Sequence, residues 1–347
     1  MMGGAPHILI VRLSAIGDVV RVLPALQIIR QAFPYAQIDW AVERKAVSVL
    51  EGHPALDALV VFDRPSATGK AVREFYTFCR TIRRSRYDIV LDFHGILKSG
   101  LLTGYSGAKQ RIGFARPRSQ EGSSLVTNQK VRLPHQPINR AEENLLLCSA
   151  LVPNSEWPSV SIHVPHDARE VVDEFFERAF DGNKRVIAMH VPVDRPEKQW
   201  PFEHFAALSD MLIADGRFDV VLTWGPGQFD SIERVLAHTK RRPIVAPETT
   251  DLKHYAWLAY RASLYFGGDT GPMHIAAAMG TPVVAVFGGT DPVRHAPFRM
   301  PHIALIAGDK PGSLAESPGM LRAVTPQMAY EACVKQALAD TRTRRID

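Results

Sequence analysis

The stretch Tyr265-Phe-Gly-Gly-Asp-Thr-Gly-Pro-Met-His-Ile-Ala-Ala-Ala-Met-Gly280 runs from an apolar strand through a polar turn into a short helix. Pro272 has the fixed φ that suits a first helical residue, and the final glycine is placed to end the helix. Free backbone N–H groups and the positive end of the dipole make such a helix start suited to anions, phosphate above all. An ordinary strand–helix connection, with Asp269 or Thr270 as cap and His274 on the surface, fits the same residues.

The segment that follows, Thr281-Pro-Val-Val-Ala-Val-Phe-Gly-Gly-Thr-Asp-Pro292, is a second buried strand that ends in a polar turn. Ligands of doubly wound sheets collect at the carboxyl ends of the strands. Two adjacent strand ends that both deliver polar loops therefore predict a ligand crevice. Its candidate residues are Asp269, Thr270, Gly271 and His274, of which the histidine is placed to bond a phosphate or ribose oxygen.

Apolar runs alternate with amphipathic helical segments along the whole chain. Residues 7–13 form the first predicted strand and residues 19–33 a helix, and the same order returns in the second half. This alternation indicates parallel sheets built from βαβ units. Residues 115–128 are polar, basic and rich in helix breakers, which predicts a long mobile loop.

The chain length of 347 residues suits two domains rather than one core. The run Val152-Pro-Asn-Ser-Glu-Trp-Pro158 is the best linker candidate. We therefore expect two doubly wound α/β domains over residues 1–158 and 159–324, followed by a helical segment over residues 325–347.

The composition is that of an ordinary globular protein, with 46% hydrophobic and 22% charged residues. Cys79, Cys148 and Cys333 are far apart and lack metal-ligand spacing, which predicts reduced thiols in a cytoplasmic protein. The N-terminal residues lack the basic region of a signal peptide, and no apolar run is long enough to span a membrane. No cluster of His, Cys or carboxylates has metal spacing, so we expect neither a protein-held metal nor a cofactor.

Positive charge is concentrated in one part of the chain. Residues 64–140 contain 15 Lys and Arg against 4 Asp and Glu, whereas the whole chain carries only +5. This asymmetry indicates an acidic partner, which is an anionic membrane surface, a phosphorylated lipid or a nucleic acid. Nucleic acid is disfavoured because the segment lacks interleaved aromatic residues and any recognised motif. A solvated face with arginines in helix caps also fits the segment.

Polar residues stand at the ends of the predicted strands in the first domain. Ser14, Gly17 and Asp18 follow the first strand, and His94 and Lys98 follow the fourth. The small residues let another molecule approach the turn closely, and a carboxylate there can accept a proton from a substrate hydroxyl as a general base. Asp18 near a helix start also fits a simple cap.

The second domain offers a comparable set. Lys198 lies in a loop just before a helix, where a lysine can neutralise a leaving phosphate or simply be solvated. Trp224 and Gly225 stand at the end of another strand. The chain has no G-x-G-x-x-G dinucleotide fingerprint, no P-loop and no G-x-S-x-G hydrolase elbow.

Four motifs occur in the order seen in glycosyltransferase family 9. They are Arg12-Leu-Ser-Ala-Ile-Gly-Asp18, Asp92-Phe-His-Gly-Ile-Leu-Lys98, Glu197-Lys-Gln-Trp-Pro201 and Gly268-Asp-Thr-Gly-Pro-Met-His274. Over essentially its whole length the chain resembles the ADP-heptose:lipopolysaccharide heptosyltransferases of that family. The first motif is more similar to the heptosyltransferase I type than to type II.

The resemblance implies the GT-B fold, in which two Rossmann-like domains face a cleft and the C-terminal helix crosses back onto the first domain. It also implies an inverting glycosyltransferase that needs no metal and passes heptose from ADP-heptose to the lipopolysaccharide inner core. The acceptor is then an anionic, Kdo-bearing lipid that the enzyme meets at the cytoplasmic face of the inner membrane.

By position, the resemblance makes Asp18 the general base that activates the acceptor hydroxyl. It assigns the donor diphosphate to Lys198 and the turn of residues 269–271, with His274 nearby. Basic residues of the first domain meet the anionic acceptor. In this chain they are Lys98 and the arginines of residues 111–132, among them Arg111, Arg116 and Arg118.

One segment departs from the family pattern. Where family members have small or hydroxyl residues that bind phosphate, this chain has His190-Val-Pro-Val-Asp-Arg195. Pro192 offers no N–H, and Asp194 would repel a phosphate if it pointed inward. The departure bears on how the diphosphate is held and on which nucleotide sugar is used.

Two other functions fit the same fold. A non-hydrolysing sugar-nucleotide epimerase shares it, although the sequence offers no separate set of carboxylates for that reaction. A non-catalytic protein that binds a nucleotide sugar or an anionic lipid through the basic segment also fits.

Overall fold

The computed structural model describes residues 5–63, 68–158, 160, 162–307 and 320–339. The chain forms two compact units, Met1–His163 and Val164–Asp347. The end of the predicted linker, Pro158, lies close to this division. Each unit contains a six-stranded parallel sheet, which confirms the doubly wound α/β architecture predicted from the alternating pattern.

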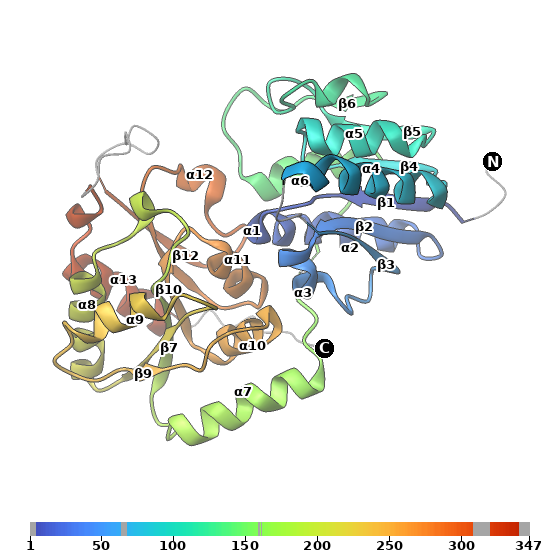
Figure 1. The fold of residues 1–347 in the computed structure, drawn as a ribbon. Helices are drawn as coiled ribbons and strands as arrows, with labels where there is room; N and C mark the ends of the chain where they lie inside the picture. The colour runs from blue at the N-terminus through green and yellow to red at the C-terminus, as the bar shows by residue number, and fades with distance from the viewer. Residues whose placement is uncertain (1–4, 64–67, 159, 161, 308–319, 340–347) are drawn as a thin grey trace. The chain divides into compact units, whose positions relative to one another are not determined.

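The sheet of the first unit has the strand order β3-β2-β1-β4-β5-β6. Helix α2 packs against α6, and α4 packs against α5 (Figure 1). Right-handed crossovers place these two pairs on opposite faces of the sheet. The strands are β1 (His7–Val11), β2 (Gln37–Glu43), β3 (Ala58–Phe62), β4 (Ile89–Asp92), β5 (Gln110–Phe114) and β6 (Gln129–Val131). The helices are α1 (Ile16–Val20), α2 (Leu23–Ala32), η1 (Arg44–Ala46), α3 (Val47–Leu50), α4 (Thr68–Ser85), α5 (Leu97–Ser106), η2 (Ser123–Leu125) and α6 (Arg140–Ser149).

The sheet of the second unit has the order β12-β11-β10-β7-β8-β9. Its core includes Trp200, Phe205 and Phe266, whose rings pack edge to face with centroids 4.9 to 5.8 Å apart. The strands are β7 (Arg185–His190), β8 (Phe218–Thr223), β9 (Ile244–Val245), β10 (Leu264–Gly268), β11 (Val283–Phe287) and β12 (His302–Ile306). The helices are α7 (His166–Ala179), η3 (Pro196–Lys198), α8 (Phe202–Asp215), α9 (Phe229–Leu236), α10 (Leu252–Arg261), α11 (Gly271–Ala278), α12 (Pro292–His295), η4 (Met320–Ala323) and α13 (Pro326–Leu338).

The helix predicted over residues 19–33 is two helices in the structure. Helix α1 ends at Val20, and α2 begins at Leu23 with Pro24 in its first turn. Proline has no N–H to donate to a preceding turn, and its ring clashes with the carbonyl there, so the helix restarts at this point.

The predicted loop of residues 115–128 is tied to the elements beside it. The Gln120 N–H donates to the Gly95 carbonyl at 2.8 Å, and the Ser119 and Ser123 hydroxyls are 2.7 Å apart. The short helix η2 within the loop packs on α5. These contacts hold the segment against the turn that follows β4.

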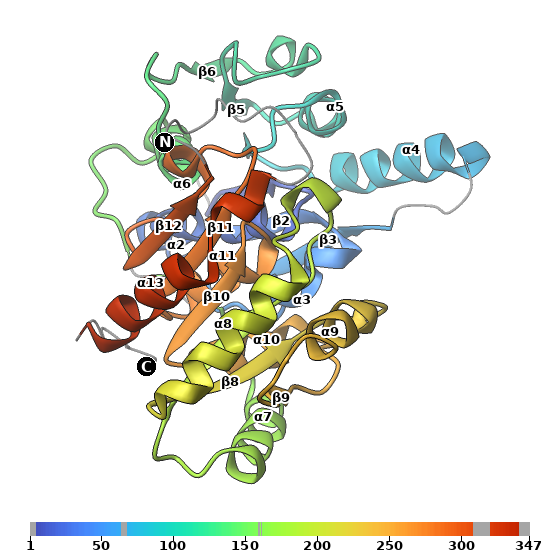
Figure 2. The same ribbon diagram turned by 90° about the vertical axis from the view of Figure 1, so that its left-hand side faces the viewer.

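The C-terminal helix differs from the expectation that residues 325–347 cross back onto the first domain. Helix α13 is part of the second unit, where it packs on α8 and on β10, β11 and β12 (Figure 2). Ala329, Cys333 and Ala337 of α13 are buried in the core of that unit. These small side chains let α13 lie close to the sheet and fix it there. Residues 340–347 lie outside the described part of the chain.

Candidate functional site

Each sheet reverses its strand order at one point. The reversal falls between β1 and β4 in the first unit and between β7 and β10 in the second. Ligands of open α/β sheets bind outside the carboxyl ends of the strands at such a switch point. The side chains that follow these four strands are therefore the candidate site residues.

Asp269 follows β10 and is the centre of a charged cluster in the second unit. Its Oδ2 accepts hydrogen bonds from Lys198 Nζ and Thr290 Oγ1, both at 2.9 Å. Its Oδ1 lies 3.7 Å from His274 Nε2. The Asp269 and His274 side chains are each 6% exposed, and that of Lys198 is 19% exposed. The structure thus brings together three residues predicted from two separate motifs.

Asp269 is ionised in the folded protein. Burial alone would raise its pKa, but the hydrogen bond from His274 and the charge of Lys198 outweigh burial and hold the pKa of Asp269 well below its usual range. Lys198 Nζ also donates to the Asp269 carbonyl oxygen at 3.3 Å. Contacts among the described residues therefore account for two of the three N–H donors of Lys198, and the third is left for a ligand.

The turn from β10 into α11 is packed closely around its backbone. A Cβ on Gly267 would lie 2.4 Å from the Tyr265 hydroxyl and 2.9 Å from the His190 carbonyl oxygen, so only glycine fits there. Thr270 is the N-cap of α11, but its side chain makes no hydrogen bond to the helix. The N–H groups at the start of α11, which include that of Gly271, are thus not capped by Thr270 and suit an anion.

Trp224 and Gly225 lie at the carboxyl end of β8, which is the neighbour of β7. Trp224 Nε1 donates to the Ala246 carbonyl at 2.9 Å, and the Trp224 ring packs 4.8 Å from that of Phe229. The Gly225 N–H donates to Gln228 Oε1 at 2.9 Å. Trp224 and Gly225 therefore lie at the same sheet edge as the Asp269 cluster, and these contacts with Ala246, Phe229 and Gln228 hold them in place.

The segment that departs from the family pattern has its acidic residue exposed. Asp194 and Arg195 are exposed, whereas Pro192 is buried. His190, at the end of β7, is also buried, with Nδ1 3.0 Å from Thr223 Oγ1. Burial lowers the pKa of His190 to about 3, so its ring is neutral at pH 7.

Acidification should destabilise the second unit through His190. Below its ordinary pKa of about 6.5, His190 binds a proton in the unfolded chain but stays neutral in the folded protein. The stability present at neutral pH is therefore lost as the pH falls. We expect this group to reduce the free energy of unfolding by up to about 1.4 kcal/mol per pH unit below its ordinary pKa. Urea unfolding at about pH 7, 6 and 5 should give a shallower pH dependence for His190→Gln than for the wild type, and equal slopes would contradict this assignment.

In the first unit Asp18 lies in α1, directly after the turn that follows β1. Its Oδ2 accepts a hydrogen bond from Arg12 Nη2, and its Oδ1 accepts one from Arg21 Nη1 at 2.7 Å. The Asp18 side chain is 33% exposed, whereas those of Arg12 and Arg21 are 8% and 9% exposed. The two guanidinium groups orient the carboxylate through charge-assisted hydrogen bonds, while solvent and ligands can still reach it.

Arg12 joins the two turns at the switch point of the first sheet. Its Nη1 donates to the Phe93 carbonyl at 2.9 Å, just after β4. Burial lowers the pKa of Arg12, and the Asp18 carboxylate opposes that shift. His94 Nδ1 accepts from the Leu13 N–H at 3.4 Å. Burial first, and then the charge of Arg12, lower the pKa of His94 to about 3, so a neutral imidazole stands beside Asp18 at pH 7.

Two of the predicted acceptor residues are each bonded to a buried glutamate. Lys98 Nζ lies 2.8 Å from Glu43 Oε1, and Arg118 Nε lies 2.9 Å from Glu143 Oε2. Arg118 Nη1 also donates to the His94 carbonyl at 3.1 Å. Arg116 is exposed. Together with Ser14 and Gly17, these residues lie in the segments that follow β1, β4 and β5, as predicted.

Arg111 lies elsewhere, which corrects its assignment to the acceptor site. It is the second residue of β5 and therefore stands near the amino end of the strand. Its Nε donates to the Val126 carbonyl at 2.7 Å and its Nη1 to the Ala108 carbonyl at 2.6 Å. The guanidinium thus links two loops at the edge of the sheet opposite to Asp18.

Sequence reasoning did not single out Arg12 and Arg21 as site residues, and it noted Thr290 only among the polar residues at the strand ends. Arg12 carried a signal, because it is a charged residue at the end of an otherwise apolar strand. Arg21 stands three residues after Asp18, a spacing that brings side chains together on a helix. Thr290 was visible only as part of a polar strand end.

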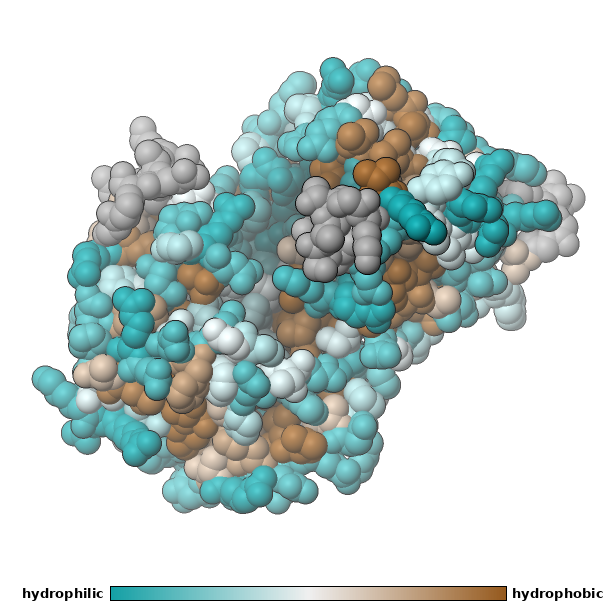
Figure 3. Space-filling model, viewed as in Figure 1, coloured by the Kyte–Doolittle hydropathy of each residue, from teal (hydrophilic) through white to brown (hydrophobic). Residues whose placement is uncertain are grey.

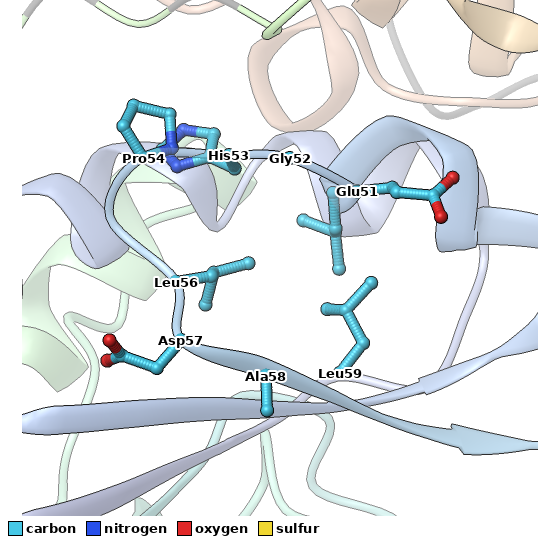
Figure 4. Close-up of a pocket in the computed structure, with 9 residues that line it drawn as sticks. Glu51, Gly52, His53, Pro54, Leu56, Asp57, Ala58 and Leu59 are labelled. Atoms are coloured by element: carbon cyan, nitrogen blue, oxygen red, sulfur yellow. The ribbon is translucent and has the colours of Figure 1, made fainter.

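A shallow hollow of about 460 Å³ lies between α3 and β3. Leu56 and Leu59 point into it, whereas the Glu51 carboxylate points away (Figure 4). The hollow borders Ala58, the first residue of β3, so it lies at the amino edge of the sheet. It is therefore separate from the candidate site.

Comparison with known sequences gives consistent matches. A sequence profile described as glycosyltransferase family 9 (heptosyltransferase) matches residues 75–312. Lipopolysaccharide core heptosyltransferase OpsX of Haemophilus influenzae is 25% identical over 83% of this chain and 81% of its own length. Lipopolysaccharide heptosyltransferase 1 of Salmonella typhimurium is 29% identical over 82% of this chain and 89% of its own.

Solved structures agree with these matches. A glycosyl transferase family 9 protein from Veillonella parvula superposes with a TM-score of 0.83 over 97% of this chain and 99% of its own at 22% identity, which shows the shared fold. E. coli heptosyltransferase WaaC with ADP gives a TM-score of 0.71 at 25% identity, over 94% of this chain and 99% of its own. These likenesses confirm the predicted GT-B fold class. In the part of the chain that the structure describes, no helix is both long and apolar enough to cross a bilayer. From the profile match, which covers more than half of its length, the chain belongs to glycosyltransferase family 9 and is a glycosyltransferase.

Proposed function

We propose that this enzyme transfers heptose from ADP-heptose to a sugar of the lipopolysaccharide inner core by a single displacement. Asp18 carries the proposal, because its carboxylate is oriented by two arginines and is still 33% exposed at the switch point of the first sheet. A carboxylate that a substrate hydroxyl can reach in a fixed orientation can act as a general base. The relatives named above are lipopolysaccharide heptosyltransferases, and one solved relative holds ADP.

In the proposed step the acceptor hydroxyl oxygen bonds to the anomeric carbon of heptose while its proton passes to Asp18. The bond from that carbon to the diphosphate oxygen breaks, and ADP leaves with the electron pair. Attack from the face opposite the leaving group inverts the anomeric configuration. Asp18 then returns the proton to solvent.

The second unit supplies groups that suit the departing diphosphate. The N–H groups at the start of α11 and the remaining donor of Lys198 are positive and are fixed before the reaction begins. Fixed donors of this kind stabilise developing negative charge without reorganisation. In this proposal they neutralise the diphosphate in place of a metal ion.

In this proposal Asp269 positions Lys198 for the diphosphate. Asp269 holds Lys198 in place, and Thr290 and His274 hold Asp269. Trp224 stands at the same sheet edge, and the proposal gives it a contact with the nucleotide.

Release of ADP tests the proposed function. Purified protein with ADP-heptose and Kdo-lipid A should release ADP and lengthen the acceptor by one heptose, and a chelator should leave the rate unchanged. Donor alone should give neither reaction. A changed sugar without acceptor would instead indicate an epimerase, and donor binding without any turnover would indicate a binding protein.

A further inference from the structure

Six large apolar side chains project into solvent from one region of the first unit. They come from α4, from α5 and from η2, which packs on α5. Figure 3 shows apolar surface over α5. We call this set the α4–α5 surface; with their exposed fractions its members are Val72 (79%), Tyr76 (51%), Leu97 (51%), Leu101 (48%), Tyr105 (42%) and Leu125 (80%).

The spacing of these residues makes them one continuous face. Leu97, Leu101 and Tyr105 are four residues apart along α5, and so are Val72 and Tyr76 along α4, so each set lies on one side of its helix. The two helices pack together, and the Tyr76 and Tyr105 rings are 6.2 Å apart. Contiguous exposed apolar surface of this kind marks a contact site for a protein or a membrane.

Basic residues surround the apolar side chains. Arg73 and Arg80 of α4 are exposed, and the Arg80 guanidinium lies 6.0 Å from the centre of the Tyr76 ring. Arg83, Arg84 and Lys109 are exposed as well, against two exposed acids, Glu74 of α4 and Glu121, which accepts from the Leu97 N–H at 3.0 Å. Such a mixture of apolar, tyrosine and basic side chains suits the interface of an anionic bilayer. There the apolar groups contact lipid tails and the basic groups contact lipid phosphates. A second copy of the chain would bring the same positive charge to this face and be repelled.

The α4–α5 surface is joined rigidly to the acceptor side of the first sheet. Helix α5 begins at Leu97, directly after the turn that carries His94. Asp92, which is 1% exposed, holds this turn by accepting hydrogen bonds from the His94 and Gly95 N–H groups and the Ser99 hydroxyl, at 2.9 to 3.0 Å. Lys98, a predicted acceptor residue, follows the exposed Leu97 in the same turn of helix. A lipid surface on this face would therefore lie next to the acceptor site.

We propose that the α4–α5 surface docks the enzyme onto an anionic lipid bilayer, with the apolar side chains in the interface and the arginines on lipid phosphates. Docking there would deliver a lipid-anchored acceptor to the turn that follows β4, and this consequence rests on the proposed function. The docking itself does not depend on turnover.

Sedimentation with vesicles tests the docking. The full-length protein should bind vesicles of phosphatidylethanolamine and phosphatidylglycerol, bind phosphatidylcholine vesicles far less, and lose binding at high salt. The variant Leu101→Gln/Tyr105→Gln should reduce binding at least about fivefold, and Arg73→Gln/Arg80→Gln should do so on anionic vesicles only. These changes affect exposed side chains, so the thermal midpoint should stay at the wild-type value.

The matched control is Val171→Gln/Met328→Gln, which removes two exposed apolar side chains, 55% and 42% exposed, from the second unit. It should bind vesicles like the wild type. Equal binding by the control and the α4–α5 variants would overturn the proposal, as would a wild-type dimer that dissociates when Leu101 and Tyr105 are changed. Turnover of a delipidated acceptor should be equal in the wild type and the variants. If the proposed function is wrong, no protein will turn over this acceptor, and the sedimentation experiment will still test the docking.

Discussion

Asp18→Asn is expected to lower the rate of heptose transfer by about 10³-fold, since general base catalysis contributes roughly 10²- to 10⁴-fold. The amide keeps the size of the side chain and one oxygen for the arginines, but it cannot accept the acceptor proton. Binding of ADP should be unchanged, because the residues that we propose bind the nucleotide belong to the second unit. Steady-state rates at saturating donor and acceptor, with calorimetric titration of ADP, measure both quantities.

Asp57→Asn is the matched control for this variant. Asp57 is also a carboxylate of the first unit that pairs with an arginine, Arg30, but it stands just before β3, at the amino edge of the sheet. Its replacement should leave the transfer rate within about twofold of the wild type. A rate for Asp18→Asn that is equally close to the wild type would remove Asp18 from the mechanism.

Lys198→Met is expected to reduce both turnover and stability. Loss of the cation that we propose faces the leaving diphosphate should cost about 10²- to 10³-fold in kcat, the range seen when one electrostatic donor is removed from an active site. The same change takes the lysine away from the buried Asp269 carboxylate and leaves it only Thr290 and His274. Loss of one partner of a buried charge pair costs about 3 kcal/mol. Urea denaturation and steady-state kinetics should therefore change together.

The double variant Lys198→Met/Asp269→Asn separates the two effects. With no buried charge left unpaired, most of the lost stability should return. Turnover should stay low, because the donor to the diphosphate is still missing. Recovery of turnover together with stability would show that Lys198 acts on the fold alone.

The parallel sheets and most of the candidate turns could be predicted because their signals are local. The stretch from β10 to α11 contains its own apolar run, its own helix-starting proline at Pro272, and its own terminal glycine at Gly280. The general topology of βαβ units then predicts that the carboxyl ends of the parallel strands lie at the same edge of the sheet. Local patterns thus placed Asp18, Lys198, Asp269 and His274 at carboxyl edges before any contact was known.

Contacts between distant segments could not be predicted in the same way. Glu43 and Lys98 stand 55 positions apart and meet only because β2 ends, and α5 begins, at the same edge of one sheet. In the sequence Arg111 is one more basic residue of its segment. In the structure it lies at the start of β5 and donates hydrogen bonds to two loop carbonyls. The small residues of α13 gave no sign of which sheet the helix covers.

The configuration of the new glycosidic bond tests the single displacement at Asp18 most directly. NMR of the product formed from ADP-heptose and Kdo-lipid A shows whether the anomeric carbon of the transferred heptose has kept or changed the configuration that it had in the donor. Attack by one activated hydroxyl predicts the opposite configuration in all of the product. The same configuration as in the donor would contradict the mechanism.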